Sequence, residues 1–416
     1  MNNQKMPQIR FESDSKGWKE YKLEQLVDFS RGQGLCRNDI DDENGTNECI
    51  LYGNLYTDYG TVIENVKHKT NMIPANAVLS KGDEVLIPGS DTTPTGLARA
   101  LCIVKENVLL GGDINILSPK FSEGRFLAYE LNKYRGEIIK RIKGTTVRHL
   151  QGADIADLKL FITEDTIAQT KISDWFSYLY ELISLEKSVY DDCLKLKNTL
   201  LTKMFPAKGK KKPKIRFKSF EDEWTICDMG NVVNTGTVLR VFKNQWQEKG
   251  IPFYRSIDVV SEYRGVESIK DKVFISKSVY DELTAKCGKV KAGDVLVTGG
   301  GSIGTPYLVK DDNPLYFKDG DLLWLIPNNN ISGEYLYRFF CTPLFTKYVY
   351  SISHKGTIMH YTIEQVNETP FYFPQKDEQI KIASFFENYD ELIKYQKIKI
   401  EKLQNIKSAC MEKMFV

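Results

Sequence analysis

Two stretches of this chain, residues 169–205 and 379–415, carry one pattern repeated at a fixed distance. Gln169 and Gln379 open the two stretches, and Phe205 and Phe415 end them, each pair lying 210 residues apart. Other identities between the two stretches keep the same offset with no gap. Within each stretch, apolar residues recur at steps of three and four, which is typical of a helix that packs lengthwise. The sequence therefore predicts two copies of one long, rigid helix.

The apolar seam of each helix is interrupted by one polar residue at the same step. These residues are Glu186 and Gln396, and a buried polar group at such a position fixes the register of paired helices. Forty residues of helix form a rod of roughly 60 Å at ~1.5 Å per residue. Either each helix folds back on its own domain, or the two pair as a long spacer. The seams are Ile172, Phe176, Leu179, Ile183, Glu186, Tyr190, Cys193, Leu196, Leu200, Met204 and Ile382, Phe386, Tyr389, Ile393, Gln396, Ile400, Leu403, Ile406, Cys410, Met414.

The rest of the chain also repeats, but at offsets that drift. Trp18 returns as Trp224 after 206 residues, whereas Gly82 returns as Gly293 after 211. Insertions and deletions collect in the loops of a common scaffold, so the drift predicts a duplicated domain with variable loops. The expected segments are a first domain at 1–163, a long helix at 164–205, a basic linker at 206–212, a second domain at 213–374 and a long helix at 375–416.

Each domain is predicted to be α+β, with alternating apolar strands and one shorter amphipathic helix. The expected strands are Ile50–Tyr56, Glu84–Ile87, Leu97–Val104 and Ile114–Leu117, then Pro252–Val259, Asp294–Thr298, Pro306–Val309 and Leu322–Ile326. The expected shorter helices are Arg125–Lys143 and Gly333–Ser351.

Composition excludes several classes of protein. The 57 Lys and Arg residues nearly balance the 55 Asp and Glu residues, so any nucleic-acid surface must be a local patch. The eight cysteines form no Cys-x-x-Cys pair, so neither a zinc site nor a disulfide framework is indicated and a cytoplasmic location is expected. No segment approaches the ~18 apolar residues of a membrane span, and residues 1–10 lack the apolar core of a signal peptide. The basic run 208–214 is a solvated linker or a phosphate contact.

Residues 299–304 match the Gly-x-Gly-x-x-Gly pattern of dinucleotide-binding loops. A dinucleotide site needs a helix after the loop, but residues 305–309 are strand-like, so a glycine-rich hairpin is predicted. No phosphate loop of the Walker type and no Asn-Pro-Pro-Tyr motif is present. Asp14 with Glu20 and Lys22 resembles a nuclease triad only loosely. No catalytic constellation and no metal site is expected.

Taken together, several weak motifs in tandem order carry a specific resemblance. They are the helix end Leu200–Pro206, the opening Pro213–Phe217 with Trp224, and Gly144-Thr145-Thr146 and Gly356-Thr357, each ahead of a helix that begins with Gln. Over nearly its whole length the chain resembles the DNA specificity subunit of type I restriction–modification systems.

That resemblance implies a non-catalytic scaffold with two target-recognition domains, at 1–163 and 213–374. Each domain would read one half of a split DNA sequence, and the two long helices would pair as an antiparallel coiled coil with pseudo-two-fold symmetry. The implied partners are double-stranded DNA, two copies of a DNA adenine methyltransferase subunit and an ATP-dependent restriction subunit. S-adenosylmethionine, ATP and magnesium are expected on those partners, and no cofactor on this chain.

Three regions of each domain are predicted to contact DNA. The alternative interpretation of each region is an ordinary polar surface loop. Ser, Thr and Asn side chains hydrogen-bond to base edges, and Arg and Lys address guanine or phosphate. The residues are Ser90, Thr92, Thr93 and Ser302 in the hairpin after each Gly-Asp strand, Tyr52, Asn54, Arg255 and Ser256 in the early strand and turn, and Lys143, Thr145, Thr146, Arg148, Lys355 and Thr357 before each long helix.

Two alternatives from other classes stay open at this point. The first alternative is an enzyme with an unrecognised methyltransferase or nuclease centre. The second is a stand-alone DNA-binding regulator that uses the same domains. Labelling of DNA by the purified chain alone would favour the first, and the absence of a neighbouring methyltransferase reading frame would favour the second.

Overall fold

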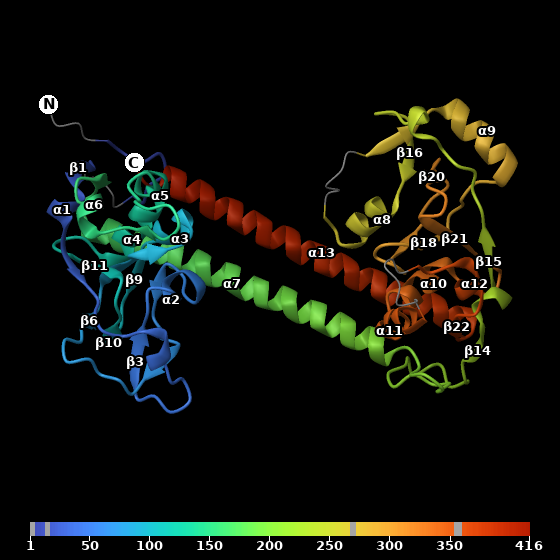
Figure 1. Cartoon of the computed structure of the whole chain (residues 1–416), viewed down its shortest axis with the longest axis horizontal. Helices are drawn as coiled ribbons and strands as arrows, with labels where there is room; N and C mark the ends of the chain where they lie inside the picture. The colour runs from blue at the N-terminus through green and yellow to red at the C-terminus, as the bar shows by residue number, and fades with distance from the viewer. Residues whose placement is uncertain (1–4, 13–16, 267–271, 353–359) are drawn as a thin grey trace. The chain divides into compact units, whose positions relative to one another are not determined.

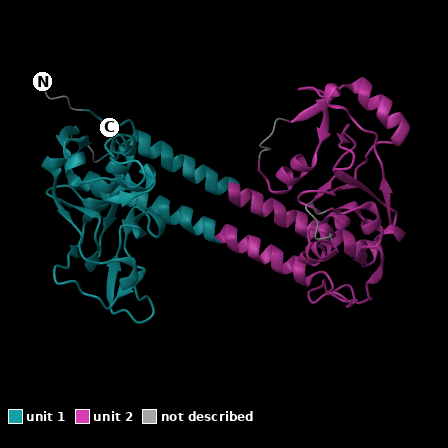
Figure 2. Ribbon diagram, in the orientation of Figure 1, with its two compact units in different colours: residues 1–188, 398–416 teal, residues 189–397 magenta. Residues whose placement is uncertain are grey.

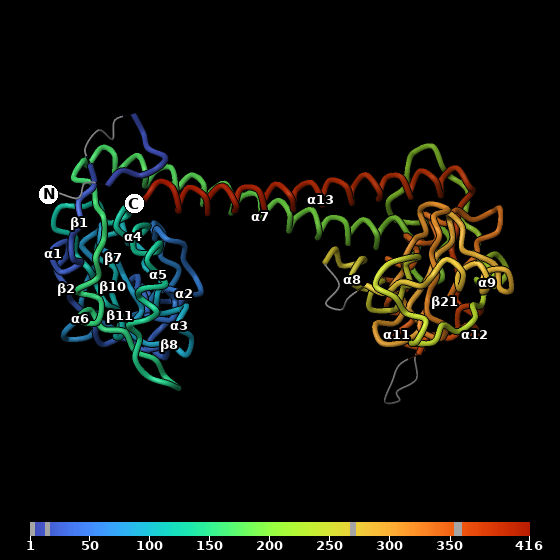
Figure 3. The backbone as a smooth tube through the Cα atoms, turned by 90° about the horizontal axis from the view of Figure 1, so that it is seen from above, coloured from blue at the N-terminus to red at the C-terminus, as the bar shows by residue number. Residues whose placement is uncertain are grey.

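The long helices α7 (Thr166–Lys203) and α13 (Lys376–Lys413) are both present and nearly as long as expected. The computed structural model of the chain describes residues 5–12, 17–266, 272–352 and 360–416 (Figure 1). It divides into a first unit, residues 1–188 and 398–416, and a second unit, residues 189–397 (Figure 2). Both divisions fall inside the long helices, which Figure 3 shows as continuous tubes. Each unit therefore contains part of α7 and part of α13.

The first unit is a mixed α/β structure with a five-stranded and a four-stranded sheet. The five-stranded order is β2-β11-β7-β9-β4, and the four-stranded order is β5-β3-β10-β6. The strands are β2 (Val27–Arg31), β11 (Ile114–Pro119), β7 (Glu84–Pro88), β9 (Leu101–Ile103), β4 (Val62–Ile63), β5 (His68–Thr70), β3 (Asn47–Ile50), β10 (Glu106–Leu110) and β6 (Leu79–Lys81), with the pairs β1 (Lys19–Lys22) with β13 (Lys159–Ile162) and β8 (Ser90–Asp91) with β12 (Arg148–His149). The helices before α7 are α1 (Leu23–Leu26), α2 (Asn54–Thr57), α3 (Pro94–Leu97), α4 (Gly124–Lys133), α5 (Arg135–Ile139) and α6 (Gly152–Ile155), with a short 3-10 helix η1 (Arg37–Asp39).

The second unit has a four-stranded and a three-stranded sheet. Their orders are β15-β21-β18-β19 and β17-β16-β20. The strands are β15 (Val233–Gly236), β21 (Leu322–Pro327), β18 (Val295–Thr298), β19 (Pro306–Leu308), β17 (Val273–Ile275), β16 (Ile251–Tyr254) and β20 (Tyr316–Phe317), with the pair β14 (Thr225–Asp228) and β22 (Pro370–Phe373). The helices are α8 (Ser256–Tyr263), α9 (Lys277–Cys287), α10 (Gly333–Phe340), α11 (Pro343–Ile352) and α12 (Ile363–Asn367), with the 3-10 helices η2 (Met229–Asn231) and η3 (Lys243–Gln245).

One strand order is common to the two units. The run β2-β11-β7-β9 corresponds to β15-β21-β18-β19, and every neighbouring pair in both runs is antiparallel. The run β5-β3-β10 corresponds to β17-β16-β20, and in both the last pair is parallel. A parallel pair needs a long crossover connection, so its recurrence at the same place is a specific likeness.

Strand β7 contributes to two apolar cores of the first unit. All five of its residues are buried, as expected of a central strand that is covered on both faces. Val85 and Ile87 join a core with the helix residue Phe126, whereas Leu86 joins a second core with Ile116. Successive side chains of a strand point to opposite faces, so β7 is shared by both cores.

The end of α13 completes the core of the first unit. Phe415 is 2 % exposed, and its ring centroid lies 6.0 Å from that of Trp18, 5.6 Å from that of Phe126 and 5.7 Å from that of Phe176. Trp18 precedes β1, Phe126 lies on α4 and Phe176 on α7. Edge-on and offset ring pairs at these separations add to the free energy gained by burial.

The end of α7 completes the core of the second unit in the corresponding way. The ring of Phe205 lies 5.9 Å from Trp224 and 5.5 Å from Tyr335, measured between centroids. Trp224 and Tyr335 are also in contact, at 6.1 Å. Each unit thus buries a phenylalanine that lies two residues beyond the end of the long helix of the other domain.

A buried glutamine fixes the beginning of each long helix. Gln169 Oε1 accepts a hydrogen bond from the backbone N of Glu123 at 2.7 Å, and Gln379 Oε1 accepts one from the backbone N of Ser332 at 2.9 Å. Both glutamines are 0 % exposed. Glu123 and Ser332 are the N-cap residues of α4 and α10, so these two helices correspond to each other.

Side chains of α7 and α13 contact each other inside both units. In the first unit, Lys399 Nζ lies 2.6 Å from Glu186 Oε1, and in the second, Lys197 Nζ lies 2.5 Å from Asp390 Oδ1. Glu186 and Gln396 are 9 % and 7 % exposed, as the sequence predicted for polar residues in a seam.

Two residues that were assigned to the seam lie outside it. Leu196 and Ile406 are 49 % and 46 % exposed, so placing them in the packed seam was wrong. A straight helix drifts by ~20° per heptad from a perfect 3.5-residue repeat, which carries such positions off the seam.

Two of the predicted strands were largely wrong, because helical turns begin inside them: only Ile50 of Ile50–Tyr56 and only 252–254 of Pro252–Val259 are strand. Strand β3 ends at Ile50 and α2 follows, since Asn54 Oδ1 accepts a hydrogen bond from the backbone N of Leu51 at 2.8 Å. Likewise β16 ends at Tyr254 and α8 follows, with Asp258 Oδ2 accepting from the backbone N of Arg255 at 3.0 Å. A polar side chain in the first turn that accepts from the backbone N three residues earlier stabilises the N-terminus of a helix.

Two further expectations, the strand at Leu97–Val104 and the unbroken shorter helices, need correction, and the glycine-rich hairpin is confirmed. Leu97 ends helix α3, so the strand expected at Leu97–Val104 is only β9. The shorter helices are each divided in two, α4 and α5 in the first unit and α10 and α11 in the second, where Pro343 cannot continue α10. The glycine-rich hairpin is confirmed, because β18 and β19 on either side of residues 299–304 pair antiparallel. No helix in the described ranges is long and apolar enough to span a membrane.

Truncation of Phe415 tests the contribution of the α13 end to the first unit. Phe415→Ala is expected to lower the free energy of unfolding by about 3–5 kcal/mol, because it leaves a cavity among three aromatic rings. The control Leu185→Ala changes a side chain that is 61 % exposed and should cost no more than about 0.5 kcal/mol. Urea unfolding followed by tryptophan fluorescence measures both, and equal midpoints for the two variants would contradict the packing described.

Glu130, on α4, is a carboxyl group buried in this core. It is 0 % exposed, and the backbone N–H of Phe161 is a hydrogen-bond donor beside its carboxyl group that opposes the effect of burial. Burial raises the pKa of Glu130, and the charge of Lys133 opposes that shift. Its ionisation at neutral pH therefore works against the folded state.

Glu130 should make stability fall as the pH rises. The folded pKa lies above the unfolded value of about 4.3, so the unfolded chain loses this proton first and is favoured as the pH climbs from there. Glu130→Gln is therefore expected to be more stable than the parent by about 1–3 kcal/mol in mildly alkaline buffer and to match it in acid below the unfolded pKa of about 4.3. Urea titrations across pH measure this, with exposed Glu181→Gln as the control, and a difference that does not change with pH would contradict it.

Candidate nucleic-acid interface

Two of the three regions predicted in the first domain meet at the short pair of strands β8 and β12. Ser90 pairs with His149, and Asp91 pairs with Arg148. The hydroxyl of Ser90 lies 2.9 Å from His149 Nδ1 and 3.2 Å from Asp113 Oδ2. Ser90 is only 6 % exposed, so its hydroxyl holds this junction together from within.

Asp91 organises the exposed loop that follows Ser90. Its carboxylate accepts hydrogen bonds from the backbone N of Thr92 at 2.6 Å and from Thr93 Oγ1 at 2.7 Å. Arg148 Nη1 donates to the carbonyl oxygen of Thr92 at 2.5 Å. Thr92 and Thr93 are exposed, so their hydroxyl oxygens remain able to accept from a ligand.

The segment before α7 forms a second exposed turn beside this loop. Backbone hydrogen bonds join Lys143 and His149 in both directions, at 3.0 Å and 2.8 Å, and they close the turn. Thr145 and Thr146 lie exposed in it. The ammonium group of Lys143 pairs with Asp154 in α6, and this ion pair holds the beginning of the turn in place.

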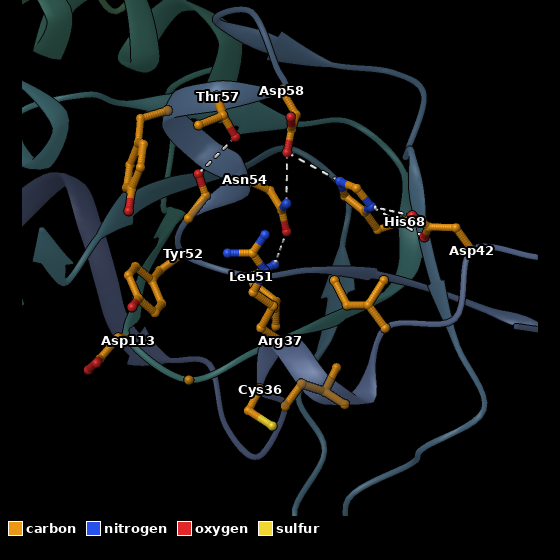
Figure 4. A pocket seen from close by; sticks show the side chains of 15 residues that line it. Cys36, Arg37, Asp42, Leu51, Tyr52, Asn54, Thr57, Asp58, His68 and Asp113 are labelled. Carbon is orange, nitrogen blue, oxygen red and sulfur yellow. Dashed lines mark hydrogen bonds and ion pairs between the residues drawn. The ribbon is translucent and has the colours of Figure 1, made fainter.

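The third predicted region borders a recess of about 810 Å³ in the first unit (Figure 4). Tyr52 is 37 % exposed on its rim. Asn54 has an internal role, since its Oδ1 accepts from the backbone N of Leu51 just before α2 and its Nδ2 donates to Asp58 Oδ2 at 2.7 Å. Arg37, from η1, lines the same recess and is exposed. The sequence did not mark Arg37, because a lone arginine in a loop belongs to no periodic pattern.

His68 lines this recess and connects three elements of the first unit. Its Nδ1 lies 3.0 Å from Asp42 Oδ2, and its Nε2 lies 3.2 Å from Asp58 Oδ2. The backbone N–H of Lys69 and then the His68 ring lower the pKa of Asp42. His68 therefore fixes the loop before β3, strand β5 and helix α2 with respect to one another (Figure 4).

In the second unit the corresponding positions are more firmly engaged. The guanidinium of Arg255 is paired with Asp258, at 2.7 Å from Nε and 3.0 Å from Nη2, and its side chain is 13 % exposed. The hydroxyl of Ser256 donates to the carbonyl oxygen of Asp321 at 3.0 Å. These contacts hold the start of α8 in place.

The glycine-rich hairpin of the second unit repeats the junction seen at β8 and β12. Gly300 forms an isolated bridge with His360, as Ser90 pairs with His149 in the first unit. Ser302 is exposed in the same hairpin. The other two predicted residues, Lys355 and Thr357, lie outside the described residues.

Chemically, these surfaces offer the hydroxyl groups of threonine, serine and Tyr52 and the guanidinium group of Arg37 on loops that hydrogen bonds hold in place. Within the described ranges, no group of three or more His, Cys, Asp or Glu side chains is arranged to hold a metal ion. Hydroxyl and guanidinium groups hydrogen-bond to base edges and phosphates. The junction residue Asp113 was not predicted, because its partners, Arg31 and Ser90, come from distant parts of the sequence.

Comparison with known proteins adds three findings. Residues 221–405 match the family model of the type I restriction modification DNA specificity domain. A putative type I restriction enzyme specificity subunit of Haemophilus influenzae is 25 % identical over 169 residues, 40 % of this chain and 40 % of the relative. The MjaIX specificity subunit of a type I restriction enzyme of Methanocaldococcus jannaschii is 26 % identical over 191 residues, 46 % of this chain and 43 % of the relative. The aligned parts thus span less than half the length of these curated relatives.

Solved structures show the same fold over almost the whole chain. The S subunit of a type I restriction–modification system from M. genitalium superposes with a TM-score of 0.62 at 15 % identity, covering 99 % of both chains. A chain from a study of complex assembly and conformational transition of the type I system has a TM-score of 0.56 at 15 % identity, covering 96 % of this chain and 97 % of that one. In its matching domain, its curated relatives and its fold, this chain resembles the DNA specificity subunits of type I restriction–modification systems, as the sequence predicted.

Proposed function

We propose that this chain is the sequence-specific DNA-binding subunit of a type I restriction–modification complex and reads a bipartite target, one half-site per domain. The observation that carries the proposal is the shared strand order with one junction in the same place, Ser90 with His149 and Gly300 with His360. The loops at these junctions differ in sequence and length. A constant frame with different loops is what reading two different half-sites requires.

Tandem duplication accounts for the correspondence between the units. Trp18 and Trp224 hold equivalent places against Phe415 and Phe205, and Gln169 and Gln379 make equivalent hydrogen bonds. Two copies related by a pseudo-two-fold suit a DNA duplex, whose backbones share such a dyad.

The long helices serve as an antiparallel coiled coil that sets the unread gap of the target. Within the first unit, the α7 residue Tyr180 meets Lys407 of α13, and further along α7 Glu186 meets the earlier residue Lys399. Contacts that advance in one helix and recede in the other support antiparallel pairing. The residues that follow α7 and α13 pack into the aromatic cores of the second and first units, which supports a rigid spacer.

An exposed apolar stripe on the helices supports recruitment of partner subunits. On α7 of the first unit, Tyr178, Leu182 and Leu185 are 67 %, 39 % and 61 % exposed at steps of four and three. On α13 of the second unit, Leu392 and Tyr395 are 49 % and 65 % exposed at the positions of Leu182 and Leu185. Apolar residues at this spacing pack against another helix, and an exposed stripe marks an interaction surface.

The proposed partners are two copies of a DNA adenine methyltransferase subunit, one for each stripe, and an ATP-dependent restriction subunit. The chain itself is non-catalytic and acts in the cytoplasm. S-adenosylmethionine, ATP and magnesium belong to the partners, where the chemistry takes place.

Half-site reading predicts that loop changes in one unit alter only one half of the target. Replacing Thr145 and Thr146 together by Ala should lower affinity for one half-site about tenfold, or ~1.4 kcal/mol, and leave discrimination at the other unchanged. Ser302→Ala, in the second unit, is the matched variant and should affect only the opposite half. Fluorescence anisotropy with duplexes mutated in either half measures this, whereas a uniform loss on all duplexes would indicate phosphate contacts instead.

The spacer predicts that the unread gap follows the length of the helices. Four residues added to α7 and four to α13 at matching points lengthen the pair by about 6 Å, and close to one full turn keeps the faces aligned. The gap should grow by roughly two base pairs, at ~3.4 Å per base pair, while both half-sites stay the same. Mapping methylated positions in cells that carry the variant measures the gap, and a methylated target with the parental gap would count against the spacer.

A further inference from the structure

A groove of about 520 Å³ on the first unit is formed by α4, α7 and α13. Ile183 and Met411 contribute its apolar floor, and Tyr180 lies beside them. Lysine side chains from all three helices, Lys133, Lys187 and Lys407, line the groove. An apolar floor beneath ammonium groups suits a ligand that carries both methylene groups and a negative charge.

The positive charge of the groove is matched at one lysine only. Lys133 Nζ donates to an oxygen of Val416 at 2.6 Å and interacts with the carboxyl group of Glu130, whereas Lys187 and Lys407 form no ion pair in the described part of the chain. Glu412 is the acidic residue that lines it, against three lysines. Lys407 Nζ lies 5.4 Å from the centroid of the Tyr180 ring. Burial lowers the pKa of Lys407, and the charges of Arg99 and Lys187 lower it further. Lys407 thus sits half-buried among like charges, an arrangement that a bound anion would stabilise.

The second unit shows what fills the equivalent place. Lys197 lies 210 residues before Lys407, and Asp390 lies 210 residues after Tyr180. There, Lys197 Nζ is 2.5 Å from Asp390 Oδ1, and Arg338 of α10 pairs with the other oxygen of Asp390. The carboxylate that satisfies the lysine in the second unit is replaced by an aromatic ring in the first.

We propose that the groove of the first unit binds an acidic side chain of a partner polypeptide, which takes the place that Asp390 occupies in the second unit. A carboxylate is the anion that the equivalent site already accepts, and the apolar floor fits the methylene groups of a glutamate. A DNA phosphate is the competing occupant. The inference does not depend on the reading of a bipartite target.

The test uses the full chain and a fluorescein-labelled hexaglutamate peptide at low ionic strength, with binding followed by anisotropy. Replacing Lys187 and Lys407 together by Ala should weaken peptide binding at least about tenfold. Replacing Lys195 and Lys397 by Ala removes the same charge from the helices of the second unit and should leave peptide affinity unchanged. Equal affinity for both double variants would overturn the proposal.

The variant Tyr180→Asp provides a second test of the groove that does not depend on the stability of the lysine variant. This change gives the first unit the carboxylate of the second, so it should block peptide binding without lowering the melting temperature. Acetylation by acetic anhydride, read by mass spectrometry, should show Lys407 modified in the free chain and protected by the peptide. Modification that the peptide does not slow would overturn the proposal.

A random-sequence duplex forms the second arm. If the lysine variant loses affinity for the duplex while peptide binding is unchanged, the groove holds a phosphate and the proposal is wrong. Failure of the proposed function would appear separately, as a parent chain that binds all duplexes equally, and would leave the peptide result unaffected.

Discussion

The structure depends on two phenylalanines that each complete a core begun by distant residues. Phe415 packs against Trp18 and Phe126, and Phe205 packs against Trp224 and Tyr335. Each of them lies two residues beyond the end of a long helix that starts against the other domain. Since burial of a large ring is among the strongest contributions to packing, the ends of the helices are tied to the cores and not only to each other.

Much of this frame could be predicted from the sequence, because the helices and central strands are determined by local apolar patterns. Strand β7 is a run of apolar residues and was expected with nearly its observed bounds. Helices α2 and α8 were missed because a single side chain, Asn54 or Asp258, starts each of them inside an apolar stretch. The break before Pro343 was missed because amphipathic periodicity continues across it.

The candidate interface was less accessible to sequence reasoning, since its groups are placed by contacts between distant segments. Thr92 and Thr93 are exposed as expected, but Ser90 turns inward to His149. Arg255 has its guanidinium held by Asp258, which a list of polar residues does not reveal. The difference between Tyr180 and Asp390 became meaningful only when each was seen beside its lysine. The repeat in the sequence shows which residues the two domains share, whereas the structure shows that Lys407 faces an aromatic ring where Lys197 faces a carboxylate.

The division of the chain has a consequence for its synthesis on the ribosome. The second unit is a continuous segment, residues 189–397, whereas the first combines residues 1–188 with 398–416. The aromatic core around Trp18 therefore waits for Phe415, which emerges long after its neighbours. The second unit can therefore finish folding before the first, and the aromatic core of the N-terminal domain stays incomplete until Phe415 has been synthesised.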